Sequence, residues 1–241
     1  MREPAFVDCH SHVVPSGDDG AGTVAEGVEL CHTAARHGTR ILFATPHVWP
    51  HLGLDQLREA RIREAFTAVA ARSETELRLG FELTPTAALL DEDPFRYRLE
   101  GTDSVLMEVP FTGPAALLFA LAEHVESAGL TPVIAHPERT EAVLAEPLLV
   151  SELAERGWAV QVNSTSLLGR HGEAAAELAW SLIEDGRAAV VASDGHRATR
   201  PPRLDEAFDA VARRLGAEAA LPLFDGTALG LHSAAGAARG P

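Results

Sequence analysis

The stretch VDCHSHVVPSGDDG (residues 7–20) is the most informative part of this chain. An apolar run that begins at Ala5 ends there on two histidines, His10 and His12, and two aspartates, Asp18 and Asp19, follow in the next loop. Imidazole and carboxylate groups are the side chains that suit zinc, manganese and iron. A strand that leaves a hydrophobic interior and ends on such groups indicates a metal site at the carboxyl end of a sheet.

Short apolar runs bounded by turn residues recur along the chain. Most are continuously apolar, which is typical of parallel strands covered on both faces. The expected strands lie at residues 5–10, 40–47, 76–83, 104–110, 131–137, 159–164 and 188–196. The expected helices lie at residues 22–37, 54–72, 114–128, 147–156, 171–186 and 204–215. This alternation of strand and helix predicts an α/β fold with a parallel sheet.

Nearly every expected strand carries a histidine or a carboxylate at its C-terminal end. In a closed parallel barrel these ends surround one mouth, where such folds place their chemistry. Side chains that are distant in sequence would then face one another. The residues at these positions are His10, His12, His47, Glu82, Glu108, His136, Asp194 and His196.

Together with Asp19, these side chains make nine potential ligands, too many for one ion. Four carboxylates buried together without cations would cost several kcal/mol each. Three divalent ions would leave the site with a charge of about +2, which attracts an anion. A water shared by two ions would lose its proton near neutral pH and supply a hydroxide nucleophile, while the ions neutralise a phosphoryl group. The cluster therefore predicts hydrolysis of a phosphate ester.

Two arginines stand next to the expected ligands. Arg139 follows His136 in IAHPERT, and Arg200 follows His196 in SDGHRATRPP. Guanidinium groups match phosphate oxygens in pairs, so we expect both arginines to bind the phosphate at the mouth.

The overall charge narrows the range of partners. The chain has 20 basic residues, all arginine, against 35 acidic ones, and its net charge of −15 argues against binding nucleic acid or anionic lipid. Cys9 and Cys31 form no disulfide framework, as expected in a reducing compartment. We find no apolar stretch of membrane-spanning length and no signal peptide, so the sequence predicts a cytoplasmic protein without membrane insertion.

The motifs resemble, in order, those of the PHP (polymerase and histidinol phosphatase) domain phosphoesterases. The resemblance is strongest to the bacterial PHP-type protein-tyrosine phosphatases of capsular and exopolysaccharide operons, and it spans about residues 5–208. The matching segments are VDCHSHVVPSGDDGAGTVAEGVEL, FATPH, GFEL, VLMEVPF, TPVIAHPERT, VQVNSTSLLGRHG, VASDGH and RPPRL.

This resemblance implies a single distorted (β/α)7 TIM-like barrel, which we place at residues 1–225. A flexible tail rich in Gly and Ala would follow at residues 226–241. The resemblance also implies three divalent ions, manganese, iron or zinc, with Arg139 and Arg200 binding phosphate. The implied ligand sets are His10, His12, Glu82 and Asp194 for one ion, Glu82, Glu108 and His136 for a second, and Asp19, His47 and His196 for a third.

The implied activity is hydrolysis of phosphotyrosine in protein by a metal-bridging hydroxide, with a tyrosine autokinase as one expected substrate. Two alternatives stay open at this point. The fold and the metal site are shared with enzymes for small phosphates, such as a sugar phosphate, histidinol phosphate or a nucleotide. A noncatalytic metal-binding or scaffolding protein is the second alternative, although the retained Glu82, Glu108 and Asp194 argue against it.

The sequence departs from the family pattern at two positions near the expected mouth. Val48 stands where a histidine is frequent, which alters the rim, and Phe81 stands where a small or polar residue is usual, which would reshape the pocket wall. The loop WPHLG (residues 49–53) is expected to set substrate choice. His51 and His171 lie in loops near the mouth and are weaker candidates for substrate contact.

Two further aspartates and a run of hydroxyls are assigned minor roles. Asp8 and Asp18 would orient their neighbours by hydrogen bonds rather than bind metal. Residues 164–166, Ser-Thr-Ser, could be taken for a nucleophile cluster, but a metal-activated water makes a side-chain nucleophile unnecessary.

Overall fold

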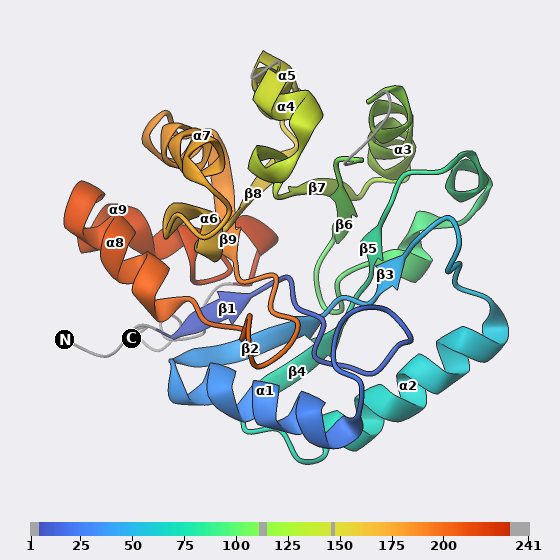
Figure 1. Ribbon diagram of the computed structural model, residues 1–241. Coiled ribbons are helices and arrows are strands. Elements are labelled where there is room, and N and C mark those ends of the chain that lie inside the picture. Colours follow the sequence, from blue (N-terminus) through green and yellow to red (C-terminus); the bar gives the residue numbers. More distant parts are fainter. Residues whose placement is uncertain (1–4, 111–114, 146–147, 232–241) are drawn as a thin grey trace, which may run out of the picture.

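A computed structural model describes residues 5–110, 115–145 and 148–231. Its strands form two parallel sheets at the centre of the molecule (Figure 1). One sheet has the order β1-β2-β4, with β1 at Phe6–Asp8, β2 at Thr39–Ala44 and β4 at Glu76–Leu79. The other has the order β3-β5-β6-β7-β8-β9, comprising His47–Val48, Glu82–Leu83, Ser104–Glu108, Thr131–Ala135, Ala159–Asn163 and Ala188–Ala192. The predicted parallel α/β fold is confirmed.

Two of the expected strands are each divided into two pieces. The second expected strand becomes β2 and β3, interrupted at Pro46, which has no N–H to give to a sheet ladder. The third becomes β4 and β5, interrupted at Gly80. After the two interruptions His47 pairs with Glu82 in register, so a histidine and a carboxylate stand side by side on adjacent strands.

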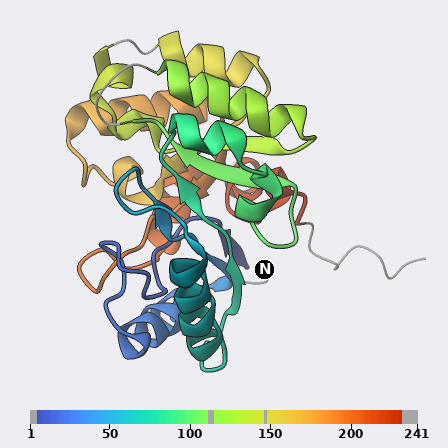
Figure 2. The same cartoon turned by 90° about the vertical axis from the view of Figure 1, so that its right-hand side faces the viewer.

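The longer helices lie outside the strands, as two perpendicular views show (Figures 1 and 2). They are α1 (Val24–Arg36), α2 (Gln56–Ala70), α3 (Ala116–Ser127), α5 (Leu148–Glu155), α7 (Glu173–Glu184) and α8 (Asp205–Leu215). Each lies inside its expected range. Shorter helices that we did not predict are α4 (Glu141–Ala145), α6 (Ser164–Leu167) and α9 (Ala217–Ala220).

Side-chain caps fix where two of these helices begin. The Thr23 hydroxyl accepts the backbone N–H of Glu26 at the start of α1, and the Asp55 carboxylate accepts that of Arg58 at the start of α2. Such caps satisfy backbone donors that have no partner within the helix. Both helices follow loops that carry candidate site residues, so the caps also fix how those loops end.

The apolar core has two parts because alternate strand residues point to opposite faces. On β2, Ile41 and Phe43 join an inner cluster, whereas Leu42 and Ala44 join an outer cluster that packs on the helices. The strands β1, β6, β7 and β9 divide their side chains in the same way. Coverage on both faces explains why the strand sequences are continuously apolar.

The first and last strands meet at their C-terminal ends. The Asp194 N–H donates to the His10 carbonyl at 2.9 Å, and Ser11 forms an isolated parallel bridge with Gly195. Residues that are far apart in the sequence are thereby placed next to each other. The expected mouth residues of β1 and β9 are neighbours for this reason.

The packed part of the chain continues past residue 225. Residues Thr227–Leu229 form a short 3-10 helix, and Leu229 is buried in the inner cluster. This part of the expected tail is therefore packed against the strands, and residues 232–241 lie outside the described residues. Among the described helices, none is long and apolar enough to cross a membrane.

Candidate metal centre

The structure brings all nine predicted ligands together, with His47, Glu82 and Glu108 in the strands β3, β5 and β6 and the others in loops. Eight of them are buried, and they form four sets of three whose ligand atoms lie within 4.8 Å of one another. These sets are His12, His47 and His196; His10, Glu82 and His136; His10, His12 and Asp194; and His47, Glu82 and Glu108. The sharing of residues between sets indicates adjacent sites rather than separate ones.

Glu82 lies at the centre of the cluster and is fully buried. Its Oε2 atom is 3.0 Å from His10 Nε2, 3.2 Å from His12 Nε2 and 2.9 Å from His47 Nδ1. No hydrogen bond of acceptable geometry reaches this oxygen from the described residues. Burial raises the pKa of Glu82, but the adjacent His10 and His47 outweigh it and hold the pKa well below its ordinary value. A buried anion surrounded by imidazole nitrogens is a place for a cation.

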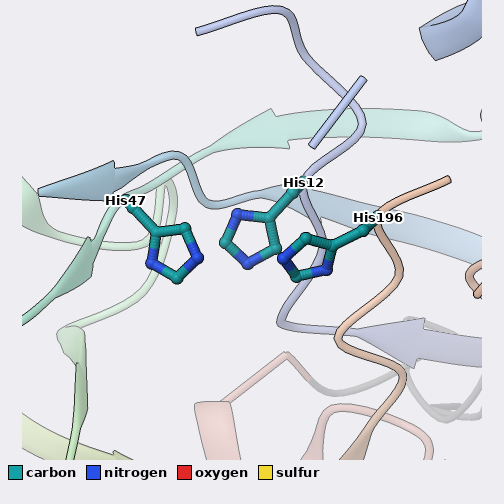
Figure 3. Close-up of side chains that lie close together, drawn as sticks. All are labelled: His12, His47 and His196. Atoms are coloured by element: carbon teal, nitrogen blue, oxygen red, sulfur yellow. The ribbon is translucent and has the colours of Figure 1, made fainter. Parts of the chain in front are cut away.

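Three imidazoles from different parts of the chain, those of His12, His47 and His196, lie close together (Figure 3). The His12 ring centroid lies 3.9 Å from that of His196 and 4.2 Å from that of His47. Asp19 Oδ1 lies 3.2 Å from His196 Nε2 and 3.5 Å from His47 Nε2. Unlike the others, the Asp19 side chain is 60% exposed, so it stands at the solvent side of the cluster.

Two candidate ligands have a left-handed backbone, which non-glycine residues rarely adopt. His136 has φ 34° and Asp194 has φ 52°, and they are the two such residues in the described ranges. Residues in these conformations persist where the surroundings hold them in place, and they concentrate at functional sites. The unusual backbone turns both side chains into the cluster at the ends of β7 and β9.

A buried hydrogen-bond chain from β8 orients two of the ligands. His10 Nδ1 donates to Gln161 Oε1 at 2.9 Å, Gln161 Nε2 donates to Asn163 Oδ1 at 2.9 Å, and Asn163 Nδ2 donates to Asp194 Oδ2 at 3.0 Å. With its hydrogen on Nδ1, His10 presents a lone pair on Nε2, which lies 3.1 Å from His12 Nε2. Such partners fix the tautomer of a metal-binding histidine.

Gln161 and Asn163 were not expected as site residues from the sequence. The signal was available in AVQVNS, where two amides stand two residues apart in an otherwise apolar strand. That spacing puts both on one face.

Glu108 stands close enough to Glu82 for the two carboxylates to repel each other. Burial and the charge of Glu82 raise the pKa of Glu108 to about 7, against the opposing effect of a hydrogen bond from Thr84. A cation between the two carboxylates would remove this repulsion. The donor set of imidazole nitrogens and carboxylate oxygens, with no thiolate, therefore fits divalent ions such as manganese, iron or zinc.

Both predicted arginines reach the cluster. Arg139 Nη1 donates to Asp194 Oδ2, and Arg200 Nη1 lies 3.8 Å from the same oxygen. The two arginines line a cavity of about 190 Å³ together with several of the candidate metal ligands. The other described residues that line it are Asp19, His47, Trp49, Glu108, His136, Asp194 and His196. An anion in this cavity would contact two guanidinium groups and would lie beside the candidate metal ligands.

The two minor aspartates make backbone contacts. Asp18 accepts the N–H groups of His47 and Gly20 at 3.1 and 3.0 Å, and so ties together two loops that carry ligands. Asp8 accepts the Ser193 N–H at 3.0 Å, and burial raises the pKa of Asp8 to about 6. Both aspartates hold the backbone beside candidate ligands.

The remaining candidates lie outside the cavity wall. Phe81 is buried edge-on against Tyr97, so the expectation that it reshapes the pocket wall is wrong. Val48 is likewise buried in the outer core cluster. His51 stacks on Trp49, and the Nδ1 atom of His171 lies 2.9 Å from Ser166 Oγ.

The fold and the site define an α/β protein with a cluster of candidate metal-binding residues near the C-terminal ends of its parallel strands. The family model for capsular polysaccharide synthesis proteins, CpsB/CapC, matches residues 6–228. The chain belongs to the CpsB/CapC family.

Known relatives agree with this placement. Tyrosine-protein phosphatase YwqE of Bacillus subtilis is 31% identical over 222 residues, which cover 88% of this chain and 86% of YwqE. Tyrosine-protein phosphatase CpsB of Streptococcus agalactiae is 30% identical over 233 residues, covering 91% of this chain and 95% of that protein.

A solved structure gives the same result for the fold. It comes from work on YwqE of Bacillus subtilis and CpsB of Streptococcus pneumoniae, described there as unique metal-dependent tyrosine phosphatases. It matches this chain with a TM-score of 0.82 at 29% identity, covering 90% of this chain and 91% of its own. Nearly the whole molecule therefore shares the architecture of these phosphatases.

Proposed function

We propose that this protein is a metal-dependent phosphatase that hydrolyses phosphotyrosine in proteins. The observation that carries the proposal is the cavity in which two arginines stand beside a cluster of buried histidines and carboxylates. Membership of a family whose relatives are named tyrosine-protein phosphatases supports the choice of substrate.

We assign the nine clustered side chains as ligands of three divalent ions. Glu82 would be shared between ions, because its two oxygens face different imidazoles. The proposed ligands are His10, His12, Asp19, His47, Glu82, Glu108, His136, Asp194 and His196. When bound, the ions would supply an activated water as nucleophile and neutralise charge on the phosphoryl group.

Arg139 and Arg200 would bind the nonbridging phosphate oxygens, whose bonds to phosphorus stay intact during hydrolysis. Both line the cavity, and both approach the carboxylate of Asp194. That carboxylate holds the two guanidinium groups at the edge of the metal cluster, where a fixed donor is worth most as charge develops on the oxygens. The tyrosyl oxygen would leave toward the open side of the cavity.

The proposal extends to the architecture and the cellular setting. The two sheets would form one distorted (β/α)7 barrel, since hydrogen bonds join the ends of β1 and β9. Buried, unpaired Cys9 and Cys31 suit the cytoplasm. In the cytoplasm, a tyrosine autokinase would be a substrate of this protein.

A substrate panel tests the function. The purified protein is assayed with a phosphotyrosyl peptide and with a sugar phosphate, histidinol phosphate and a nucleotide, and its metals are counted in the same preparation. We expect about three ions per chain and a higher kcat/KM for the peptide. A preference for a small phosphate would contradict the assigned substrate but would still support phosphatase activity. No turnover in buffer supplemented with manganese, iron or zinc would refute the proposed phosphatase activity.

A further inference from the structure

Trp49 differs from every other described residue that lines the cavity. The other eight carry carboxylate, guanidinium or imidazole groups, whereas Trp49 presents an indole. Binding ions and phosphate requires no large apolar surface. An indole on a wall of polar groups therefore has to serve a different part of the substrate, or only to support the wall.

The loop that carries Trp49 is held in place by a partly buried network of hydrogen bonds to Arg58. The Arg58 guanidinium donates to the carbonyls of His47 at 2.8 Å, Leu52 at 2.9 Å and Ser16 at 3.1 Å. The Leu52 N–H closes the turn by donating to the Trp49 carbonyl at 3.0 Å. These bonds fix the loop against the backbone of the proposed ligand His47.

The Trp49 ring is also held by its neighbours. It stacks on the His47 imidazole with a centroid distance of 4.2 Å and an interplanar angle of 24°. His51 stacks on it at 5.3 Å and 21°. The indole is thus a preorganised surface, so contact with a ligand requires little further ordering.

We infer that Trp49 is a specificity-determining residue that contacts the aromatic ring of the substrate. In a phosphotyrosyl group one oxygen separates phosphorus from the ring, so a phosphate bound at Arg139 and Arg200 places the ring within the same small cavity. Aromatic rings attract each other in offset-stacked or edge-to-face arrangements. This inference rests on the proposed function and explains how the site distinguishes an aryl phosphate from an alkyl one.

The test measures binding of two inert phosphonates by titration calorimetry to protein loaded with Mn²⁺. Benzylphosphonate carries a ring and methylphosphonate does not, so the ratio of their Kd values reports the ring contact alone. We expect the wild type to prefer benzylphosphonate, Trp49→Phe to keep that preference within threefold, and Trp49→Leu to lose about fivefold or more of it. Phe95→Leu is the matched control, because Phe95 is a 49% exposed aromatic residue that does not line the cavity, and it should keep the preference.

Several outcomes would overturn the inference. These are no preference in the wild type, an unchanged preference in Trp49→Leu, equal losses in Trp49→Phe and Trp49→Leu, or an equal loss in Phe95→Leu. Because the readout is a ratio, a variant that merely weakens the wall lowers both affinities and leaves the ratio unchanged. Turnover of p-nitrophenyl phosphate by the same wild-type preparation tests the phosphatase function separately, so failure of one claim is distinguishable from failure of the other.

Discussion

Asp194 makes different contacts with its two oxygens. Oδ1 faces the imidazoles of His10 and His12 at 3.5 Å, and Oδ2 receives Arg139 and the Asn163 amide. Burial raises the pKa of Asp194, but His10 and His12, together with His136 and Arg200, outweigh it and hold the pKa well below its ordinary value. One carboxylate therefore joins the proposed metal centre to the proposed phosphate site.

Replacing Arg139 with alanine should lower turnover of phosphotyrosyl peptide by roughly 100-fold or more, because a fixed donor to the phosphoryl oxygens is lost. Steady-state kinetics and elemental analysis on the same preparation check this. Metal content should stay near the wild-type value. The control is Arg187→Ala, because Arg187 precedes β9 at the opposite end of the strands. Near-normal turnover in Arg139→Ala would remove this residue from the mechanism.

At this scale the sequence predicts ligand types better than their supporting contacts. His10 and Asp194 were expected because imidazole and carboxylate at a strand end have few other uses. Gln161 and Asn163 were not, because an amide in a strand is as common in a structural role as beside a metal. The function of these amides depends on a chain of contacts between β8, β1 and β9, which only the fold creates.

Among the elements, α1 shows how closely a helix packs on a ligand-bearing loop. A Cβ atom at Gly27 would lie 2.2 Å from the Val13 carbonyl oxygen, and Val13 directly follows His12. A glycine inside a helix normally costs about 1 kcal/mol relative to alanine. Here the close approach of helix to backbone accounts for it.

Gly27→Ala should destabilise the protein by about 1–2 kcal/mol, since overpacking against backbone outweighs the gain in helix propensity. Thermal unfolding followed by circular dichroism should show Tm lower by roughly 3–6 °C. Gly53→Ala is the control, because no atom lies within 4 Å of its Cβ position. Equal melting of both variants with the wild type would show that the Val13 loop yields at little cost.

The sequence also leaves part of the strand geometry undetermined. The helix ranges were anticipated to within a few residues, because helical periodicity and terminal glycines mark them. The interruptions at Pro46 and Gly80 were not anticipated. A continuous apolar run has the same sequence pattern whether or not its hydrogen bonds to the neighbouring strand are interrupted. Yet these interruptions place His47 opposite Glu82 on adjacent strands. Breaks that the sequence pattern does not reveal therefore help to form the candidate site.

On the scale of the whole molecule, the proposed ions act as cross-links between the ends of different strands. Removing them should both abolish turnover and lower Tm, because ligands that bind only the folded state stabilise it by about 2.7 kcal/mol at 100 times Kd. Differential scanning calorimetry with and without chelator checks the stability, and elemental analysis confirms removal. Restoring Mn²⁺ should recover both properties. An unchanged Tm after verified removal would mean that the strands need no such cross-links.

Architecture at this scale was predictable in outline. Strand and helix alternate regularly enough to indicate a parallel α/β fold, and polar strand ends indicate where its site lies. The packing of Leu229 against the inner cluster was not predictable, because Gly/Ala-rich composition conceals one buried leucine.

The contact between the ends of β1 and β9 also affects the order in which the protein folds. His10 and Asp194 are separated by 194 − 10 = 184 positions in the sequence. Contacts so distant in sequence form late, because closing a long loop costs entropy. We therefore expect the proposed ligands to come together only when the fold is nearly complete, so that metal binding follows the pairing of these strand ends.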